Sequence, residues 1–148
     1  MALEELYREV ILDHYRNPRN RPPLTTADYA AEGVNPLCGD EVTVQVAFAG
    51  DRVGAVSVRG HGCSISQSSG SMMSEAIKGL TRQELTDLSQ RFQRMLTSES
   101  ADQSLDQERP GSVFGDLEAL QGVRRYPVRI KCAALPWTTL DQALAPQS

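Results

Sequence analysis

"CGDEVTVQVAFAGDRVGAVSVRGHGC", residues 38–63, is the stretch that decides the fold. In its first half Val42, Val44 and Val46 alternate with polar residues, which is the two-residue period of a half-buried strand. The "AGD" at 49–51 supplies a turn. A second run of apolar residues follows the turn: Val53, Ala55 and Val58. The pattern predicts a β-hairpin with two antiparallel strands.

Three chemically active residues lie at the ends of this hairpin. An antiparallel hairpin brings the entrance of its first strand beside the exit of its second, so we expect Cys38, Asp40 and Cys63 to be neighbours. "NPLCGDEV" (35–42) suits either an ordinary turn that contains a thiol or a pair of metal ligands across one glycine. Cys63 begins a helix, where the dipole favours a thiolate, although the segment alone equally suits a Gly-rich strand-to-helix turn.

Apolar residues at helical spacing predict helices on both sides of the hairpin. Extended structure is expected at 28–34, and helices within 2–15, 60–80, 81–96, 112–123 and 126–144. Thr81 and Glu84 form a capping box at the start of one helix, and Pro136 is expected to kink the last. His14 lies on the apolar stripe of the first helix, which favours a structural role.

Strands followed by helices predict an α+β fold, here a small antiparallel sheet of about three strands packed with helices. The 148 residues suit one domain, 1–148, with no internal repeat. Residues 97–111, "TSESADQSLDQERPG", are polar and acidic and have no periodicity. We therefore expect a mobile acidic loop near 97–111.

Composition excludes several classes of function. A formal net charge of -4 argues against a nucleic-acid surface, which needs clustered Lys and Arg. No apolar run approaches the ~20 residues of a membrane span, and the acidic start differs from a basic signal peptide. Three cysteines without a CxxC spacing argue against a disulfide framework and common zinc fingers. We expect a cytoplasmic protein that partners neither nucleic acid nor membrane.

The third cysteine, Cys132, lies on the last helix with Arg129 three residues before it, where a guanidinium could stabilise a thiolate. Three thiolates and one carboxylate suit tetrahedral Zn²⁺, and sulfur ligands equally suit iron–sulfur species. Spacing alone does not bring Cys132 to the hairpin end. His61 is a possible substitute ligand, although its position better fits a solvent-facing histidine.

At these residues the chain resembles the IscU and NifU N-terminal family of iron–sulfur cluster assembly scaffolds, and most closely its SufU branch. The matching segments run in order over nearly the whole chain. They are "ILDHYRNPRN" (11–20), "NPLCGDEV" (35–42), "GCSISQSSGSMMSEAIKG" (62–79) and "GDLEALQGVRRYPVRIKCAALPW" (115–137).

The resemblance implies an IscU-like α+β fold in which Cys38, Asp40, Cys63 and Cys132 surround one metal. Lys131 stands where IscU-type scaffolds carry a histidine, and the acidic segment with "GDLEALQGV" resembles the SufU insertion. SufU proteins bind zinc and accept sulfur from a SufS-type, pyridoxal-phosphate-dependent cysteine desulfurase. By resemblance Cys38 is the sulfur acceptor, and recipient apoproteins or other Suf components are further partners.

The sequence leaves several functions open. The favoured one is a zinc-binding sulfur carrier, which would act as a sulfurtransferase by thiolate attack on a persulfide. The alternatives are a scaffold that assembles a transient [2Fe–2S] cluster, with iron on the same residues, and a small domain with a purely structural zinc. A cysteine hydrolase is weakly supported, because His14 and His61 are the only histidines available as a base.

Overall fold

The computed structural model describes residues 3–97, 109, 111 and 113–145. Its elements follow one another in the order α1 (Leu3–Arg16), β1 (Tyr29–Asn35), β2 (Asp40–Ala49), β3 (Arg52–His61), α2 (Ser64–Ala76), α3 (Arg82–Thr97), η1 (Gly115–Arg125) and α4 (Pro127–Leu144). The predicted three-stranded sheet and its helices are confirmed. Most of the predicted acidic loop near 97–111 lies outside the described residues.

The sheet is antiparallel in the order β1-β2-β3, so β2 is its central strand. The register pairs Asn35 with Asp40 across β1 and β2, and Glu41 with His61 across β2 and β3. The turn between β1 and β2 and the end of β3 therefore lie at the same end of the sheet. Val42, Val44 and Val46 are buried, as their alternation predicts.

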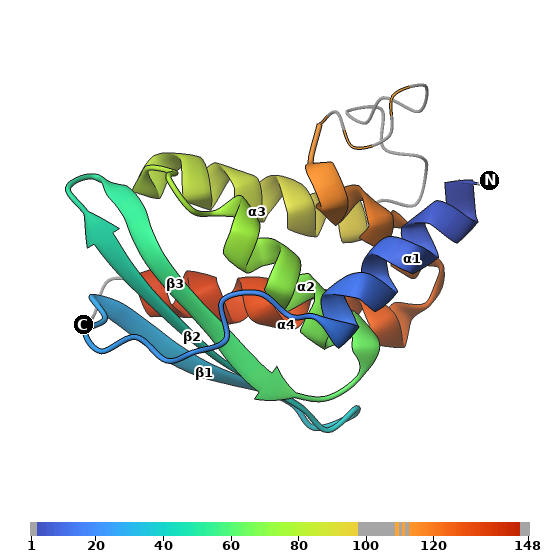
Figure 1. Ribbon diagram of the computed structural model, residues 1–148. Coiled ribbons are helices and arrows are strands. Elements are labelled where there is room, and N and C mark those ends of the chain that lie inside the picture. Colours follow the sequence, from blue (N-terminus) through green and yellow to red (C-terminus); the bar gives the residue numbers. More distant parts are fainter. Residues whose placement is uncertain (1–2, 98–108, 110, 112, 146–148) are drawn as a thin grey trace.

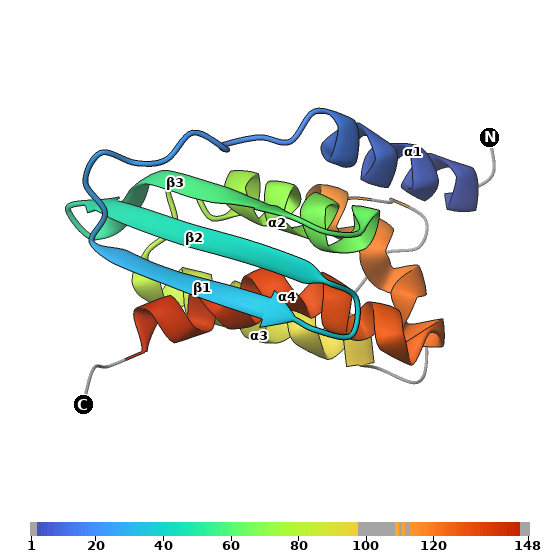
Figure 2. The same cartoon turned by 90° about the horizontal axis from the view of Figure 1, so that it is seen from below.

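Helices α2 and α4 cover one face of the sheet, and α3 packs against α4 on the same side (Figures 1 and 2). The core between the two layers joins the valines of β2 and β3 to helix residues such as Met72, and Phe92 stacks on Trp137 at 4.7 Å between ring centroids. The predicted capping box is confirmed: Glu84 N–H donates to Thr81 Oγ1, and Thr81 N–H donates to Glu84 Oε1. Pro136 lies inside a continuous α4.

His14 ties three elements together at the end of α1. It is buried, with Nδ1 2.8 Å from Ser71 Oγ on α2 and Nε2 2.9 Å from Asp116 Oδ2 on η1. This confirms its structural role. Leu6 of the same helix is 41% exposed, although α1 packs against α2 and η1.

Helix α4 approaches the sheet closely because Gly33 leaves room for it. A Cβ on Gly33 of β1 would overlap Thr139 Oγ1 and lie 3.3 Å from Leu135 Cδ1. A Cβ on Gly70 of α2 would lie 2.9 Å from Val58 Cγ1 of β3, so this glycine lets α2 pack closely on the sheet. The close packing of α4 at Gly33 fixes how far α4 runs along β1, and hence where Cys132 lies.

We predict that Gly33→Ala destabilises the fold by about 1–3 kcal/mol, because the added methyl group forces α4 away from β1. The matched control is Gly122→Ala, whose Cβ would meet no atom within 4 Å and which should leave stability unchanged or slightly raised. Urea unfolding of both variants with equal zinc loading measures the difference. A Gly33→Ala variant as stable as the wild type would show that close packing of α4 on β1 does not require a glycine at this position.

Candidate metal centre

The three cysteines and Asp40 come together at the end of the sheet where β1 turns into β2. Cys38 lies in that turn, and Asp40 is the first residue of β2. Cys63 is the N-cap of α2, and Cys132 lies in the second turn of α4. In both ribbon views this turn and the starts of α2 and α4 lie at one end of the molecule (Figures 1 and 2).

The distances between these side chains suit a small metal ion. The Sγ atoms of Cys38 and Cys132 are 3.3 Å apart, and the ligand atoms of Cys38, Asp40 and Cys132 all lie within 4.8 Å of one another. Cys63 Sγ is 3.7 Å from Asp40 Oδ2 but outside that compact group. Zinc bonds of ~2.0–2.3 Å put tetrahedral ligand atoms about 3.3–3.8 Å apart, so the donor set fits zinc.

Asp40 is the best fixed of the four side chains. It is buried, and its Oδ1 accepts a hydrogen bond from the Cys63 backbone N–H at 2.8 Å. A Cβ on Gly62, whose φ is 147°, would lie 2.8 Å from Asp40 Cα and overlap Oδ1. A glycine is therefore required before Cys63. Asp40 Oδ2 is left for a metal or for the Cys63 thiol.

Cys63 caps α2 in place of the usual serine or threonine. Its Sγ accepts a hydrogen bond from the Ser66 backbone N–H at 3.5 Å. The sulfur is therefore held by the helix that it starts, as its position after a Gly-rich turn predicts.

Cys132 is fully buried. Burial raises the pKa of its thiol well above the ordinary value of 9.0, and hydrogen bonding with Cys38, Asp40 and Cys63 raises it further. Without a metal Cys132 therefore holds its proton, and a bound cation must displace that proton to gain the thiolate. The structure places this residue where sequence spacing alone could not.

Asn35, the last residue of β1, was missed by the sequence reasoning. Its side-chain Nδ2 donates to Cys132 Sγ at 3.8 Å, and its backbone carbonyl oxygen accepts from the Cys38 N–H at 3.2 Å. Asn35 is buried and faces Asp40 across the sheet. Asn35 thus contacts both Cys38 and Cys132. In the sequence, only its place beside a proline in "NPLCGD" could have pointed to it.

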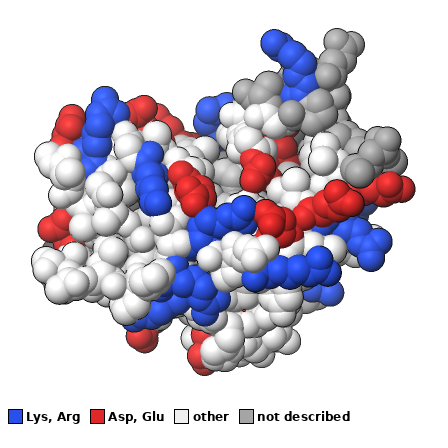
Figure 3. Space-filling model, in the orientation of Figure 1, with Lys and Arg blue, Asp and Glu red and all other residues white. Residues whose placement is uncertain are grey.

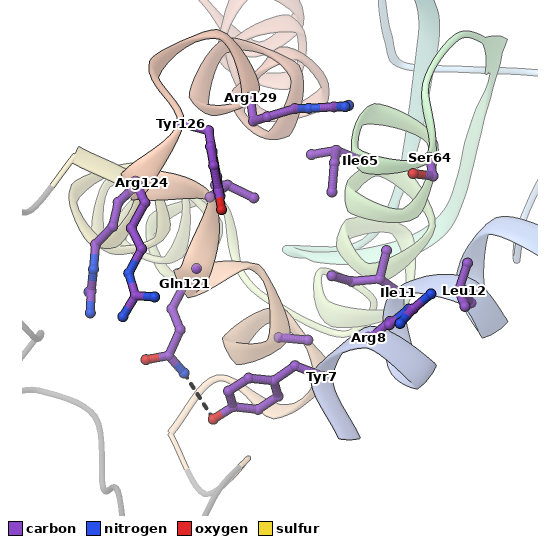
Figure 4. Close-up of a pocket in the computed structure, with 14 residues that line it drawn as sticks. Tyr7, Arg8, Ile11, Leu12, Ser64, Ile65, Gln121, Arg124, Tyr126 and Arg129 are labelled. Atoms are coloured by element: carbon purple, nitrogen blue, oxygen red, sulfur yellow. Dashed lines mark hydrogen bonds between the residues drawn. The ribbon is translucent and has the colours of Figure 1, made fainter. Parts of the chain in front are cut away.

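Three further residues that the sequence analysis names, His61, Lys131 and Arg129, lie outside this group. His61 Nε2 is 2.9 Å from Glu41 Oε2 in an exposed cross-strand pair, as a solvent-facing histidine would be. Lys131 is exposed on α4. Arg129 is also exposed, and it lines a pocket beside η1 (Figure 4). Stabilisation of the Cys132 thiolate by Arg129 stays a prediction.

Known proteins resemble the chain over nearly its full length. The family model for the NifU-like N-terminal domain matches residues 6–133. The zinc-dependent sulfurtransferase SufU of Bacillus subtilis is 42% identical over 97% of this chain and 92% of its own. The iron–sulfur cluster assembly scaffold protein IscU of Streptococcus pyogenes is 34% identical over 96% of this chain and 84% of its own.

The fold agrees with these sequence matches. A crystal structure of FiSufU from Fervidobacterium islandicum AW-1, described as a candidate iron–sulfur cluster assembly scaffold for the SUF system, superposes with a TM-score of 0.81. It is 35% identical and covers 97% of this chain and all of its own. The chain therefore belongs to the NifU-like N-terminal domain family of iron–sulfur cluster assembly proteins.

We predict that Asp40→Asn lowers zinc affinity by at least about tenfold while the fold persists, since changes even outside the ligand shell have such effects. The amide oxygen can still accept from the Cys63 N–H, so this hydrogen bond persists while the charge and the second oxygen are lost. Asp40→Ala loses this hydrogen bond as well and should be about 1–3 kcal/mol less stable. Competition with a chromophoric chelator and urea unfolding measure the two effects. Wild-type zinc affinity in Asp40→Asn would exclude Asp40 as a ligand.

A second prediction concerns Asn35. Asn35→Leu keeps the side-chain size but removes the N–H donated to Cys132 Sγ, so electron density on that sulfur rises. In cobalt-substituted protein the sulfur-to-metal charge-transfer band should move to longer wavelength. Asn35→Asp is the matched variant, because it keeps the shape but replaces the donor with an acceptor. An unshifted band in both variants would show that Asn35 does not act on the sulfur.

Proposed function

We propose that this protein holds zinc on Cys38, Asp40, Cys63 and Cys132 and accepts persulfide sulfur from a SufS-type, pyridoxal-phosphate-dependent cysteine desulfurase. The observation that carries the proposal is unequal anchoring. Cys38 is half-buried in a turn between exposed Leu37 and Gly39, whereas Cys63 caps a helix and Cys132 is fully buried. Cys38 is therefore the sulfur that can leave the group with least disturbance of the fold.

The reaction is an exchange between two sulfur atoms. The Cys38 thiolate attacks the outer sulfur of the desulfurase persulfide, and a new S–S bond forms on Cys38. The old S–S bond breaks, and its electron pair leaves on the desulfurase cysteine as a thiolate. The step needs no external oxidant or reductant. Bound zinc supplies the positive charge that keeps the thiols of this site deprotonated.

An apolar surface beside Cys38 suits docking of a protein partner. Val34, Leu37 and Val128 are 63%, 72% and 56% exposed, and they come from the end of β1, the β1–β2 turn and the start of α4. Large exposed apolar side chains gathered around a reactive group are typical of an interaction site. The sulfur would pass from Cys38 to recipient apoproteins or other Suf components.

Similarity to the Bacillus subtilis sulfurtransferase supports the zinc and the sulfur transfer, since that relative is zinc-dependent by name. We place this activity in the cytoplasm. The sulfurs of Cys38 and Cys132 are 3.3 Å apart, and a pair of thiols so close persists most readily in a reducing compartment.

A second candidate is a scaffold that builds a transient [2Fe–2S] cluster on the same four residues. It is favoured by the relative from Streptococcus pyogenes, which is a scaffold by name, and by the sulfur-rich donor set. Anaerobic reconstitution with iron and sulfide separates the two functions. A stable cluster that absorbs visible light and displaces zinc favours the scaffold.

We predict that wild-type protein, purified with one zinc per chain, stimulates the cognate desulfurase and acquires a persulfide, and that Cys38→Ser does neither. The assay measures alanine and persulfide formed from cysteine. Cys38→Ser should also retain more zinc than Cys132→Ser, because the buried position tolerates loss of its ligand least.

Two results would contradict this proposal. A folded Cys38→Ser variant that stimulates turnover as wild type does would remove Cys38 as the acceptor. Wild type that carries zinc but gives no stimulation, and unfolds when zinc is chelated, would instead favour a purely structural zinc.

A further inference from the structure

A pocket of about 750 Å³ opens beside the candidate metal centre, between α1, the first turn of α2, η1 and the start of α4 (Figure 4). Ser64, which follows Cys63, lines it from α2, and Arg129, one helical turn before Cys132, lines it from α4. The volume is within the range of sites that bind small ligands or a few side chains of a partner. Nothing in the sulfur chemistry above uses this pocket.

The pocket concentrates positive charge. It is lined by Arg8, Arg124, Arg125 and Arg129, and no carboxylate is among the described residues that line it. None of the ion pairs within the described part of the chain involves these arginines. The whole chain is acidic, with a net charge of -4, and the face drawn in Figure 3 carries both signs of charge. Four guanidinium groups around one hollow therefore indicate an anionic ligand.

One of these arginines carries a buried donor without an acceptor. Nη1 of Arg124 is shielded from solvent and has no hydrogen-bond partner among the described residues. Arg19 and Arg59 each have such an atom too, but neither lines this pocket. An unsatisfied buried donor is unfavourable by about 1–3 kcal/mol, and rotation of the guanidinium towards a ligand oxygen in the pocket would relieve this cost.

The remaining lining is apolar and aromatic. Ile11, Ile65 and Val123 supply apolar surface, and Tyr126 is 63% exposed beside them. Tyr7 accepts a hydrogen bond from Gln121 Nε2 at 2.9 Å, drawn in Figure 4. Burial and the charge of Glu118 raise the pKa of Tyr7, so its hydroxyl keeps its proton and can donate to a ligand.

The charge of Glu118 acts on Tyr7, but among the described residues Glu118 forms no ion pair with the arginines of the pocket. It is buried, and its Oε2 accepts hydrogen bonds from the backbone N–H groups of Val113 and Phe114, both at 2.9 Å. Its carboxylate is thus committed to the start of η1. The four arginines that line the pocket outnumber this buried carboxylate.

We propose that this pocket binds an acidic segment of a partner protein, with carboxylates on either side of an apolar side chain. The arginines come from different elements and lie on opposite sides of the opening: Arg8 on α1, and Arg124 and Arg129 on the η1–α4 side (Figure 4). A lone phosphate is held by donors that converge on it, whereas successive carboxylates suit guanidinium groups spread around an opening.

The position of the pocket supports a protein as the occupant. Tyr126, the N-cap of α4, borders the pocket, and Val128, two residues further along, is one of the exposed apolar residues named above with Leu37. A protein docked over Cys38 would therefore extend across α4 to the arginines. Binding of an acidic segment does not depend on sulfur transfer, so the two proposals are tested separately.

The test uses a short fluorescein-labelled peptide of alternating glutamate and leucine, with zinc-loaded wild-type protein and fluorescence anisotropy. We expect saturable binding of this peptide and no binding of the counterpart with glutamine in place of glutamate. The Arg124→Gln variant should bind the peptide at least about tenfold more weakly, because a charge-assisted hydrogen bond is lost. Arg8→Gln, on the opposite wall, should weaken binding as well, so the result does not rest on one variant. Arg94→Gln, exposed on α3, is the matched control and should bind as wild type does.

Three outcomes would overturn the proposal. Equal weakening by Arg94→Gln would show a general charge effect, and absence of saturable binding would remove the site. Saturable binding of sodium pyrophosphate that depends on Arg124, with none of the peptide, would make it a small-anion site instead. Circular dichroism and zinc content verify that each variant is folded. Because no desulfurase is present, failure here leaves the sulfur-acceptor proposal standing, and the reverse also holds.

Discussion

The hydrogen bond from the Cys63 backbone N–H to the Asp40 carboxylate is the contact on which the candidate site depends. It joins the start of β2 to the start of α2, the two ends that the antiparallel register already brings together. Gly62 lets the two backbones approach closely enough for the bond to form. Asp40 is thereby fixed in a buried position, and the sulfurs of the cysteines are arranged around it.

The packing of α4 completes the site from the other side. Ser69 on α2 donates its hydroxyl to the Ala133 carbonyl at 2.6 Å and accepts from Trp137 Nε1 at 3.2 Å. Together with the close contact of α4 at Gly33, these bonds set the position of α4 along the sheet. Cys132 then reaches the same end of the sheet as Cys38. Stability and site geometry therefore rest on the same small residues.

The part of the site at the hairpin end could be predicted from the sequence, and the part that depends on the packing of α4 could not. The valine alternation defines the hairpin, and the antiparallel rule then brings Cys38, Asp40 and Cys63 together without any knowledge of the helices. Cys132 was beyond such reasoning, because its place depends on tertiary packing between α4, β1 and α2. The resemblance to a family supplied what periodicity did not.

The same limit explains the other residues that sequence reasoning missed. Asn35 carries no metal-ligand signature, and its contact with Cys132 exists only because α4 lies against the end of β1. The arginines of the pocket are distant in the chain, and no local pattern joins Arg8 to Arg124. Local periodicity predicts elements, whereas such side-chain groups arise from the way the elements pack.

The buried charge at the candidate site favours a bound cation, and the way each side chain is held indicates which of them can move most easily. Asp40 is buried, and no ion pair within the described residues involves it, so its carboxylate has only hydrogen bonds from an amide and from thiols to offset the loss of water. A divalent cation would balance this charge and draw the proton from buried Cys132. Three of the four side chains are held by a strand, a helix N-terminus or a helix interior, and Cys38 is held only by a turn. Of the four side chains, Cys38 could therefore move with least disturbance of the fold, and it lies between exposed Leu37 and Gly39.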